Sequence, residues 1–196
     1  MKRTGKSPWP AIIPNRDCAP GSRSSSHNNG DCMKKIMTKL FLCLAFAAIS
    51  VTAVAQGTVV PKWKIGDLEH YMDTTSVPTV INFWATFCKP CIAEIPHFQE
   101  LTAQYKNEGV RLLLVSLDLP EDYKKIPAFM QKRKVTAPVA FLDESNADLF
   151  CPKVDKSWSG ALPATLFLNK RSGYRHFIEE PLTRAQLENE LKKLVQ

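Results

Sequence analysis

Residues 83–91, FWATFCKPC, join an aromatic run to two cysteines that are separated by Lys89 and Pro90. The aromatic run belongs to TVINFWA at residues 79–85, and this composition of β-branched and aromatic residues is typical of a buried strand. The next stretch, residues 91–107, carries apolar residues at helical spacing. The two cysteines are therefore expected where a core strand meets the first long helix.

A cysteine at that junction lies in an environment that favours its thiolate. The unpaired backbone N–H groups and the positive end of the helix dipole stabilise a negative sulfur, and Lys89 adds a nearby cation. We therefore expect Cys88 to be the exposed nucleophile and Cys91, one turn deeper, to be its resolving partner. A disulfide between them closes a very small loop, so it can be opened and re-formed at modest cost.

The same spacing also suits half of a structural zinc site. Completing that site would need two more cysteine or histidine ligands, and the available residues are not in paired spacing: Cys151, His70, His97 and His176. A peroxidase would need a threonine three residues before its attacking cysteine, whereas Thr86 lies two residues before Cys88. We therefore expect no metal at this pair.

The formal net charge of +7 is concentrated near the N-terminus. Residues 1–55 hold 8 of the 26 basic and 2 of the 19 acidic residues, which leaves 18 basic against 17 acidic residues at positions 56–196. This nearly neutral body gives no electrostatic basis for binding nucleic acid.

The N-terminal region has the organisation of an export signal. A cationic stretch at residues 33–39 precedes an uncharged, mostly apolar run at residues 40–54, and Ala53-Val54-Ala55 supplies the small residues that signal peptidase accepts. We predict a non-native or disordered extension at residues 1–32, a signal peptide at residues 33–55, and a mature domain at residues 56–196. The expected location is the periplasm, in the cell envelope.

The mature domain keeps three cysteines, Cys88, Cys91 and Cys151. An odd number in an exported protein argues against a disulfide scaffold and for a special pair with one spare thiol. The simplest interpretation of Cys151 is a buried small hydrophobe, and the alternative is a third redox thiol. Trp158 is expected either to form substrate surface beside the dithiol or to cap the core.

The rest of the mature chain alternates strands and helices. Residues 56–71 show little apolar periodicity and are expected to form an irregular lead-in or a short hairpin around Trp63 and Ile65. Strands are expected at residues 79–85, 110–118, 138–143, 163–169 and 174–179, and helices at residues 91–107, 121–134 and after a capping box at Thr183, with a short helix or turn at residues 144–150. This order predicts an α/β domain with a central mixed β-sheet and helices on both faces.

FWATFCKPC, together with IAEIP at residues 92–96 and ALPATLFLN at residues 161–169, resembles the thioredoxin superfamily. Within it, the chain is similar to the exported TlpA/ResA-like thiol-disulfide oxidoreductases. The resemblance covers about residues 75–195 and places Pro96 where thioredoxins have a helix-kinking proline. It implies a thioredoxin-like fold with a redox-active disulfide between Cys88 and Cys91 and no other cofactor.

The resemblance also implies roles for single residues. Pro163 matches the family's cis-proline, whose loop offers backbone groups of Leu162 to a substrate strand. Glu94 matches an acidic residue that is associated with proton handling and cysteine pKa. Asn82 stands where thioredoxin itself has a buried aspartate, and Phe87 stands where a tryptophan usually precedes the first cysteine. Further substrate contacts are expected from Lys89, Pro90 and Trp84.

The implied reaction is a two-step exchange with a protein disulfide. The thiolate of Cys88 attacks the substrate, and Cys91 resolves the mixed disulfide, which releases the reduced substrate and leaves this protein oxidised. We therefore predict a monomeric protein disulfide reductase that is recharged by a membrane-bound electron donor. The same residues would serve a disulfide donor, and the alternative from another class is a redox-inert metal-binding (copper) or scaffolding module on the same fold.

Overall fold

The computed structural model describes residues 59–196, so the expected extension and signal peptide lie outside the described residues. Within these residues the chain forms a six-stranded sheet in the order β1-β4-β3-β2-β5-β6. The strands are β1 (Lys62–Trp63), β2 (Thr79–Trp84), β3 (Arg111–Ser116), β4 (Val139–Leu142), β5 (Ala164–Asn169) and β6 (Tyr174–Ile178). Strands β1 to β4 pair in parallel, whereas β5 and β6 pair antiparallel. The predicted mixed sheet is confirmed.

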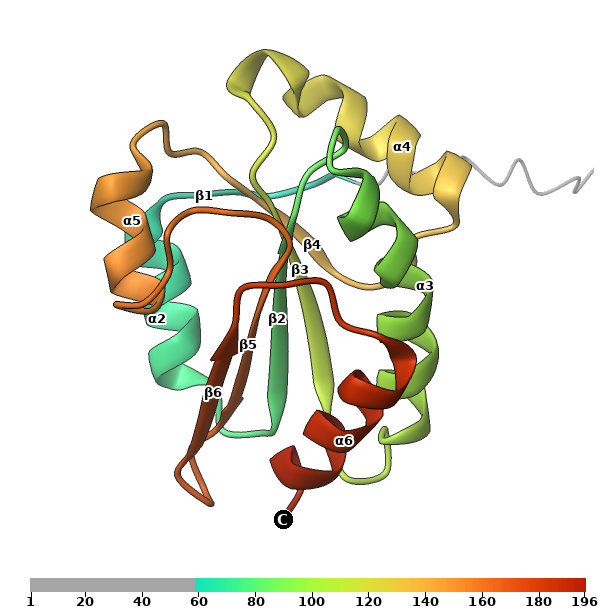
Figure 1. Ribbon diagram of the computed structural model, residues 1–196. Coiled ribbons are helices and arrows are strands. Elements are labelled where there is room, and N and C mark those ends of the chain that lie inside the picture. The colour runs from blue at the N-terminus through green and yellow to red at the C-terminus, as the bar shows by residue number, and fades with distance from the viewer. Residues whose placement is uncertain (1–58) are drawn as a thin grey trace, which may run out of the picture. The chain divides into compact units, whose positions relative to one another are not determined.

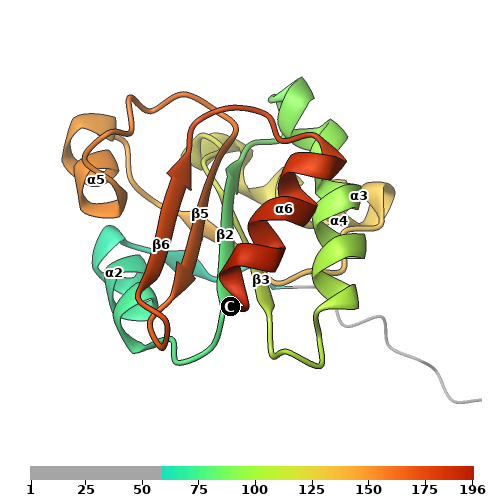
Figure 2. The same ribbon diagram turned by 60° about the horizontal axis from the view of Figure 1, so that its bottom comes forward.

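Helices cover both faces of this sheet. They are α2 (Ile65–Thr74), α3 (Lys89–Gln104), α4 (Ile126–Arg133), α5 (Ala147–Val154) and α6 (Arg184–Leu194), with a 3₁₀ segment η1 (Pro120–Lys125) before α4. Figures 1 and 2 show α3, α4 and α6 on one side of the strands and α2 and α5 on the other. None of the helices between residues 59 and 196 is long and apolar enough to cross a membrane.

The central strand β2 faces a different core on each side of the sheet. Val80 and Trp84 belong to the core under α3, α4 and α6, whereas Ile81 and Phe83 belong to the core under α2 and α5. Every side chain of β2 is buried, which explains its almost continuous apolar composition. The sheet thus separates two hydrophobic cores.

For the described part of residues 56–71, which begins at residue 59, the expectation was wrong. Instead of an irregular lead-in or hairpin, β1 pairs in parallel with β4, and α2 follows it directly. Leu68 and Met72 of α2 are buried in the core that α5 also covers. A helix of ten residues with Gly66 in its first turn is marginal alone, so this packing stabilises it.

Two other helical segments differ from the sequence prediction. The helix expected at residues 121–134 is divided into η1 and α4, with Pro127 in the first turn of α4, where its missing N–H costs no hydrogen bond. The short helix or turn expected at residues 144–150 is instead α5, which begins after Asn146 because that side chain accepts a hydrogen bond from the backbone N–H of Asp148. The predicted capping box of Thr183 and Gln186 at α6 is confirmed.

Candidate active site

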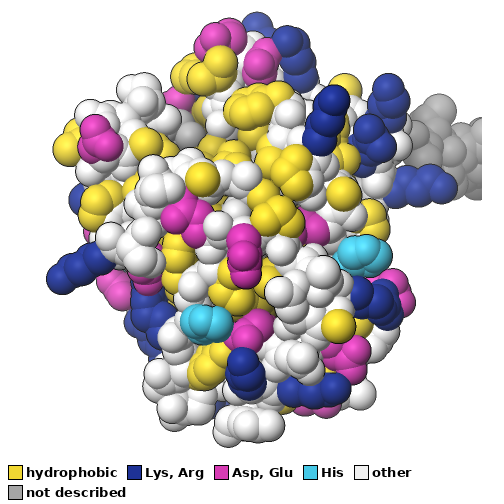
Figure 3. All heavy atoms as spheres, viewed as in Figure 1, with side chains coloured by type: hydrophobic (Ala, Val, Ile, Leu, Met, Phe, Trp, Pro, Cys, Tyr) yellow, Lys and Arg dark blue, Asp and Glu magenta, His cyan; other side chains and the backbone are white. Residues whose placement is uncertain are grey.

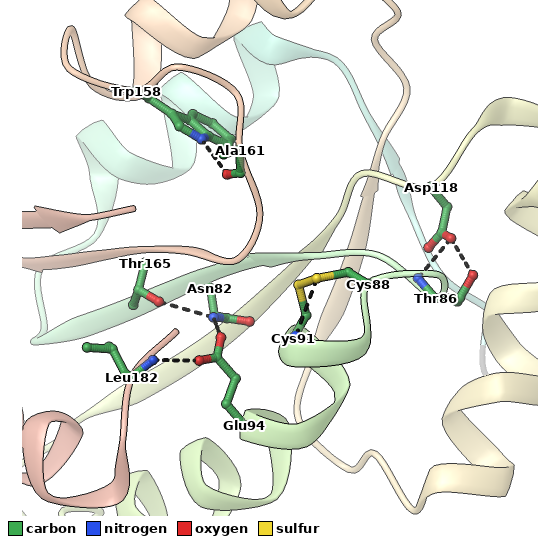
Figure 4. Close-up of a disulfide and its surroundings, with 10 residues drawn as sticks. All are labelled: Asn82, Thr86, Cys88, Cys91, Glu94, Asp118, Trp158, Ala161, Thr165 and Leu182. Carbon is green, nitrogen blue, oxygen red and sulfur yellow. Dashed lines mark hydrogen bonds between the residues drawn. A yellow bond between two sulfur atoms is a disulfide. The ribbon is translucent and has the colours of Figure 1, made fainter. Parts of the chain in front are cut away.

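The cysteine pair lies between the end of β2 and the first turn of α3, as predicted. Cys88 is the N-cap residue of α3 and forms a disulfide with Cys91, which is in the helix. The backbone N–H of Cys91 donates to the sulfur of Cys88 at 3.3 Å. Cys88 keeps 8% of its surface exposed, whereas Cys91 is fully buried. Cys88 is thus largely buried rather than exposed as expected, but it is the more accessible residue of the disulfide shown in Figure 4.

A buried aspartate anchors the loop that carries Cys88. One carboxylate oxygen of Asp118 accepts hydrogen bonds from the Thr86 hydroxyl and, at 2.9 Å, from the Thr86 backbone N–H. The other oxygen accepts from the hydroxyl of Ser116 at 2.7 Å. The sequence prediction assigned no role to Asp118. The sequence feature that could have indicated this role is Ser116 and Asp118, two short polar residues at the end of the mostly apolar run at residues 110–118.

Glu94 lies behind the disulfide, one helical turn after Cys91, and is 4% exposed. One carboxylate oxygen accepts from the side-chain amide of Asn82 at 2.9 Å, and the other accepts from the backbone N–H of Leu182 at 2.9 Å. Burial raises the pKa of Glu94 above its ordinary value, although these two hydrogen bonds oppose the shift. Glu94 is thus a buried acid close to the redox pair.

Asn82 connects Glu94 with the opposite strand. Its side-chain nitrogen also donates to the hydroxyl of Thr165 on β5 at 3.1 Å, so both amide hydrogens are used. Its side-chain oxygen is buried and has no hydrogen-bond partner among the described residues. Figure 4 shows this oxygen pointing toward the cysteines and away from Glu94.

The loop before β5 contributes the other wall of the site. The Leu162–Pro163 peptide bond is cis, which confirms the expectation for Pro163. Leu162 is half-buried and packs against both hydrophobic cores. Trp158 is 5% exposed and packs against Phe83 with the rings tilted and their centroids 4.6 Å apart. Its indole N–H donates to the carbonyl of Ala161 at 3.1 Å. Trp158 therefore caps the core and braces the cis-proline loop.

Trp84 does not lie where the sequence prediction expected it. Its side chain is fully buried and packs against Phe129 of α4 with ring centroids 5.4 Å apart. This position leaves no side-chain surface for a substrate to touch, so Trp84 supports the site from beneath. The physical reason is the strand period, which turns the side chain into the core under α3 and α4.

Exposed residues surround Cys88. Lys89 and Pro90, both expected to contact substrate, are exposed in the first turn of α3. Two large apolar side chains are also exposed here, Phe87 at 62% and Leu119 at 53%. Figure 3, which has the same view as Figure 1, shows hydrophobic side chains gathered over the upper part of the face turned to the reader. Both side chains lie in loops at the carboxyl ends of β2 and β3, where the disulfide also lies.

Cys151 belongs to the core on the other face of the sheet. It is 3% exposed in α5, whereas Cys88 and Cys91 are part of the core under α3. Burial, with smaller contributions from the charges of Glu179 and Asp148, raises the pKa of Cys151 to about 11. This position favours the buried-hydrophobe interpretation over a third redox thiol. Among residues 59–196 there is no group of three or more histidine, cysteine or acidic side chains that could hold a metal ion.

Comparison with known proteins agrees with this geometry. The model of the AhpC/TSA family matches residues 57–175. The thiol-disulfide oxidoreductase ResA of Geobacillus kaustophilus is 31% identical over 147 residues, which cover 73% of this chain and 80% of the relative. ResA of Oceanobacillus iheyensis is 29% identical over 146 residues, covering 70% of this chain and 72% of the relative.

Solved structures show the same fold. A thioredoxin-related protein from Neisseria meningitidis serogroup B superimposes with a TM-score of 0.54 at 24% identity, covering 62% of this chain and 88% of that protein. A thiol:disulfide interchange protein of the thioredoxin family from Chlorobium tepidum gives a TM-score of 0.50 at 17% identity, covering 62% of this chain and 81% of that protein. With a CxxC pair at the head of α3 and a cis-proline before β5, the chain therefore belongs to the AhpC/TSA family and, within it, to the ResA-like thiol-disulfide oxidoreductases.

Proposed function

We propose that this protein is an exported reductase of protein disulfides, in which Cys88 attacks and Cys91 resolves. The observation that carries the division of roles is the difference in exposure between the two residues, 8% for Cys88 and 0% for Cys91. Cys88 is accessible at the N-terminus of α3, where backbone N–H groups favour its thiolate, and Cys91 is fully buried one turn deeper. Attack by Cys88 gives a mixed disulfide that the neighbouring Cys91 can resolve, because the two sulfurs are within bonding distance.

Glu94 is the proposed proton-handling group of this exchange. Resolution requires Cys91 to lose its proton, and Glu94 is the buried acid one helical turn away. Because its pKa is raised, Glu94 can exchange a proton nearer to neutral pH than an exposed carboxyl group can. Lys89, on the exposed side of Cys88, favours the thiolate of the attacking residue.

Substrate is expected to lie across the exposed apolar side chains beside Cys88. Phe87 and Leu119 provide apolar contacts, and Leu162 provides backbone groups next to the cis-proline. Lys89 and Pro90 complete the surface at the first turn of α3. Such a surface suits a protein segment with apolar residues next to its cysteine better than a small charged disulfide.

Insulin reduction with dithiothreitol as electron source tests the exchange chemistry. The wild-type protein should accelerate precipitation of the insulin B chain, and Cys88→Ser should abolish the acceleration because no other accessible thiol exists among the described residues. Cys151→Ala is the matched control and should retain the activity. Cys91→Ser should accumulate a mixed disulfide through Cys88. A wild-type protein without any activity would favour the alternative, a redox-inert metal-binding or scaffolding module.

A glutathione redox titration tests the direction of electron flow. A reduction potential near −270 mV, about that of thioredoxin, supports the proposed reductase, whereas a potential near −120 mV, about that of DsbA, would indicate a disulfide donor. A reductase working outside the cytoplasm also needs an electron source, for which we propose a membrane-bound donor.

N-terminal sequencing of the exported protein tests the proposed signal peptide, and the sequence should begin at Gln56.

A further inference from the structure

Two buried side-chain atoms among residues 59–196 have no hydrogen-bond partner in the oxidised protein, Asn82 Oδ1 and Trp84 Nε1, and of the two only the oxygen of Asn82 is an acceptor. Asn82 is fully buried, and an unpaired amide oxygen in such a position lowers the free energy of unfolding. Native proteins rarely keep such an atom without a purpose. The missing donor is therefore expected to appear in another state of the protein.

The amide cannot turn to remove this cost. Its nitrogen donates to Glu94 and to Thr165, so exchanging oxygen and nitrogen would place the oxygen against the carboxylate of Glu94. Glu94 is itself held by the backbone N–H of Leu182. The oxygen of Asn82 is thus fixed on the side opposite to Glu94.

Helix geometry places Cys91 on that side. Cys91 and Glu94 are three residues apart on α3, so both lie on the face of the helix that packs against the sheet. Glu94 contacts the nitrogen end of the Asn82 amide, and Cys91 lies one turn closer to the head of the helix. Figure 4 shows the amide oxygen directed toward the sulfur pair.

Reduction supplies the donor. A dithiol donor gives two electrons and two protons, the bond between the sulfurs of Cys88 and Cys91 breaks, and the donor becomes a disulfide. One proton ends on Cys91, and the other ends on Cys88 or, where Cys88 is a thiolate, in solvent. The oxidised pair has no S–H group, whereas reduced Cys91 has one.

We propose that Asn82 is a positioning residue for the resolving thiol, whose S–H donates a hydrogen bond to the Asn82 side-chain oxygen in the reduced protein. The proposal rests on the proposed exchange through Cys88 and Cys91. The bond stabilises only the reduced state and removes the unpaired atom of the oxidised state. Both effects make the disulfide easier to reduce, so Asn82 raises the reduction potential and helps the donor to recharge the protein.

Infrared spectroscopy of the S–H stretch tests the bond directly. The full chain with Cys88→Ala is compared with the full chain with Cys88→Ala and Cys91→Ala, so that the difference spectrum contains the Cys91 thiol alone. We expect this band at a lower frequency than that of an unbonded alkanethiol in apolar solvent. Adding Asn82→Ala should move the band to the unbonded frequency. The matched control is Thr165→Val, which removes the other bond of the same amide and should leave the band in place.

The glutathione equilibrium provides a second measurement. Asn82→Ala should shift it toward the disulfide by about tenfold, which corresponds to roughly 30 mV in the negative direction. A Cys91 band at the unbonded frequency in the protein with Asn82 intact would overturn the proposal even if Asn82→Ala fails to fold. A band that stays lowered in Asn82→Ala would overturn it too, because the thiol would then donate to another acceptor. If the wild-type protein does not reduce insulin at all, that result would instead refute the proposed function.

Discussion

Glu94 occupies a position in which a carboxyl group holds its proton more tightly than in the unfolded chain. Burial raises its pKa above the ordinary value of 4.5, against the hydrogen bonds from Leu182 and Asn82. Since the folded protein binds this proton more tightly than the unfolded chain, the free energy of unfolding should fall as pH rises from about 4.5 through the raised pKa. Below that window the contribution is fully present, and above it the loss is complete.

Glu94→Gln should remove this pH dependence. We expect the unfolding free energy of the wild-type protein, measured by urea titration at a series of pH values, to fall relative to that of Glu94→Gln across the window. Glu100→Gln is the control, because the hydrogen bond from Arg184 lowers the pKa of that exposed carboxyl and gives the opposite sign. A wild-type protein that gains stability over Glu94→Gln as pH rises would contradict a raised pKa of Glu94.

At the scale of elements, the junction between β2 and α3 depends on the loop after β3. Thr86 donates two hydrogen bonds to Asp118, and Cys88 follows two residues later. Thr86→Val keeps the side-chain shape but removes the hydroxyl, so it should lower the unfolding free energy by about 1 kcal/mol. It should also slow insulin reduction, because the loop that carries the attacking sulfur loses one of its anchors.

Thr74→Val separates these two effects. The hydroxyl of Thr74 donates to the carbonyl of His70 at 2.7 Å at the end of α2, away from the disulfide. This variant also loses one hydrogen bond but should reduce insulin at the wild-type rate. Equal rates for Thr86→Val and Thr74→Val, compared at matched folded concentration, would argue against a role of the Asp118 anchor in exchange.

Local patterns predicted some elements well and others poorly. The composition of β2 identified it as a buried strand, strands were also predicted at β3 and β5, and the capping box at Thr183 located the start of α6. Helix α2 was missed because its stability comes from Leu68 and Met72 packing on a core that is built by distant residues. The resemblance implied a role for Glu94, but its hydrogen bonds with Asn82 and Leu182 were not predicted. Leu182 donates through its backbone N–H, which any residue at that position would offer, so the sequence carries no signal for this contact.

For the molecule as a whole, Glu190 joins the outer strand β6 to the closing helix α6. Its carboxylate accepts hydrogen bonds from the Tyr174 hydroxyl at 2.5 Å and from Lys193 at 2.7 Å, and it pairs with the ring of His176 at 2.8 Å. Burial alone would raise the pKa of Glu190, but the hydrogen bonds from Lys193, Tyr174 and His176 outweigh it and lower the pKa to about 2. The carboxylate therefore stabilises the fold above its ordinary pKa.

Acid unfolding should reveal this contact between β6 and α6. The stabilisation is fully present above pH 4.5 and is lost as pH falls from 4.5 toward about 2. In Glu190→Gln that loss should be absent, so the unfolding free energies of the two proteins should converge as pH is lowered. Glu188→Gln, which breaks an exposed pair with Lys192, is the control and should change the pH dependence much less.

The sheet that separates the two hydrophobic cores also sorts the thiols of the described domain. Three cysteines allow three possible disulfides, and two of these would have to include Cys151, on the far side of β2 from Cys88 and Cys91. Once β2 is flanked by β3 and β5, no rearrangement short of unfolding can bring Cys151 to the other two sulfurs. A domain that exchanges disulfides with other proteins is thereby prevented from forming a wrong disulfide with its own Cys151. The fold itself ensures the correct pairing, so no isomerase is needed for it.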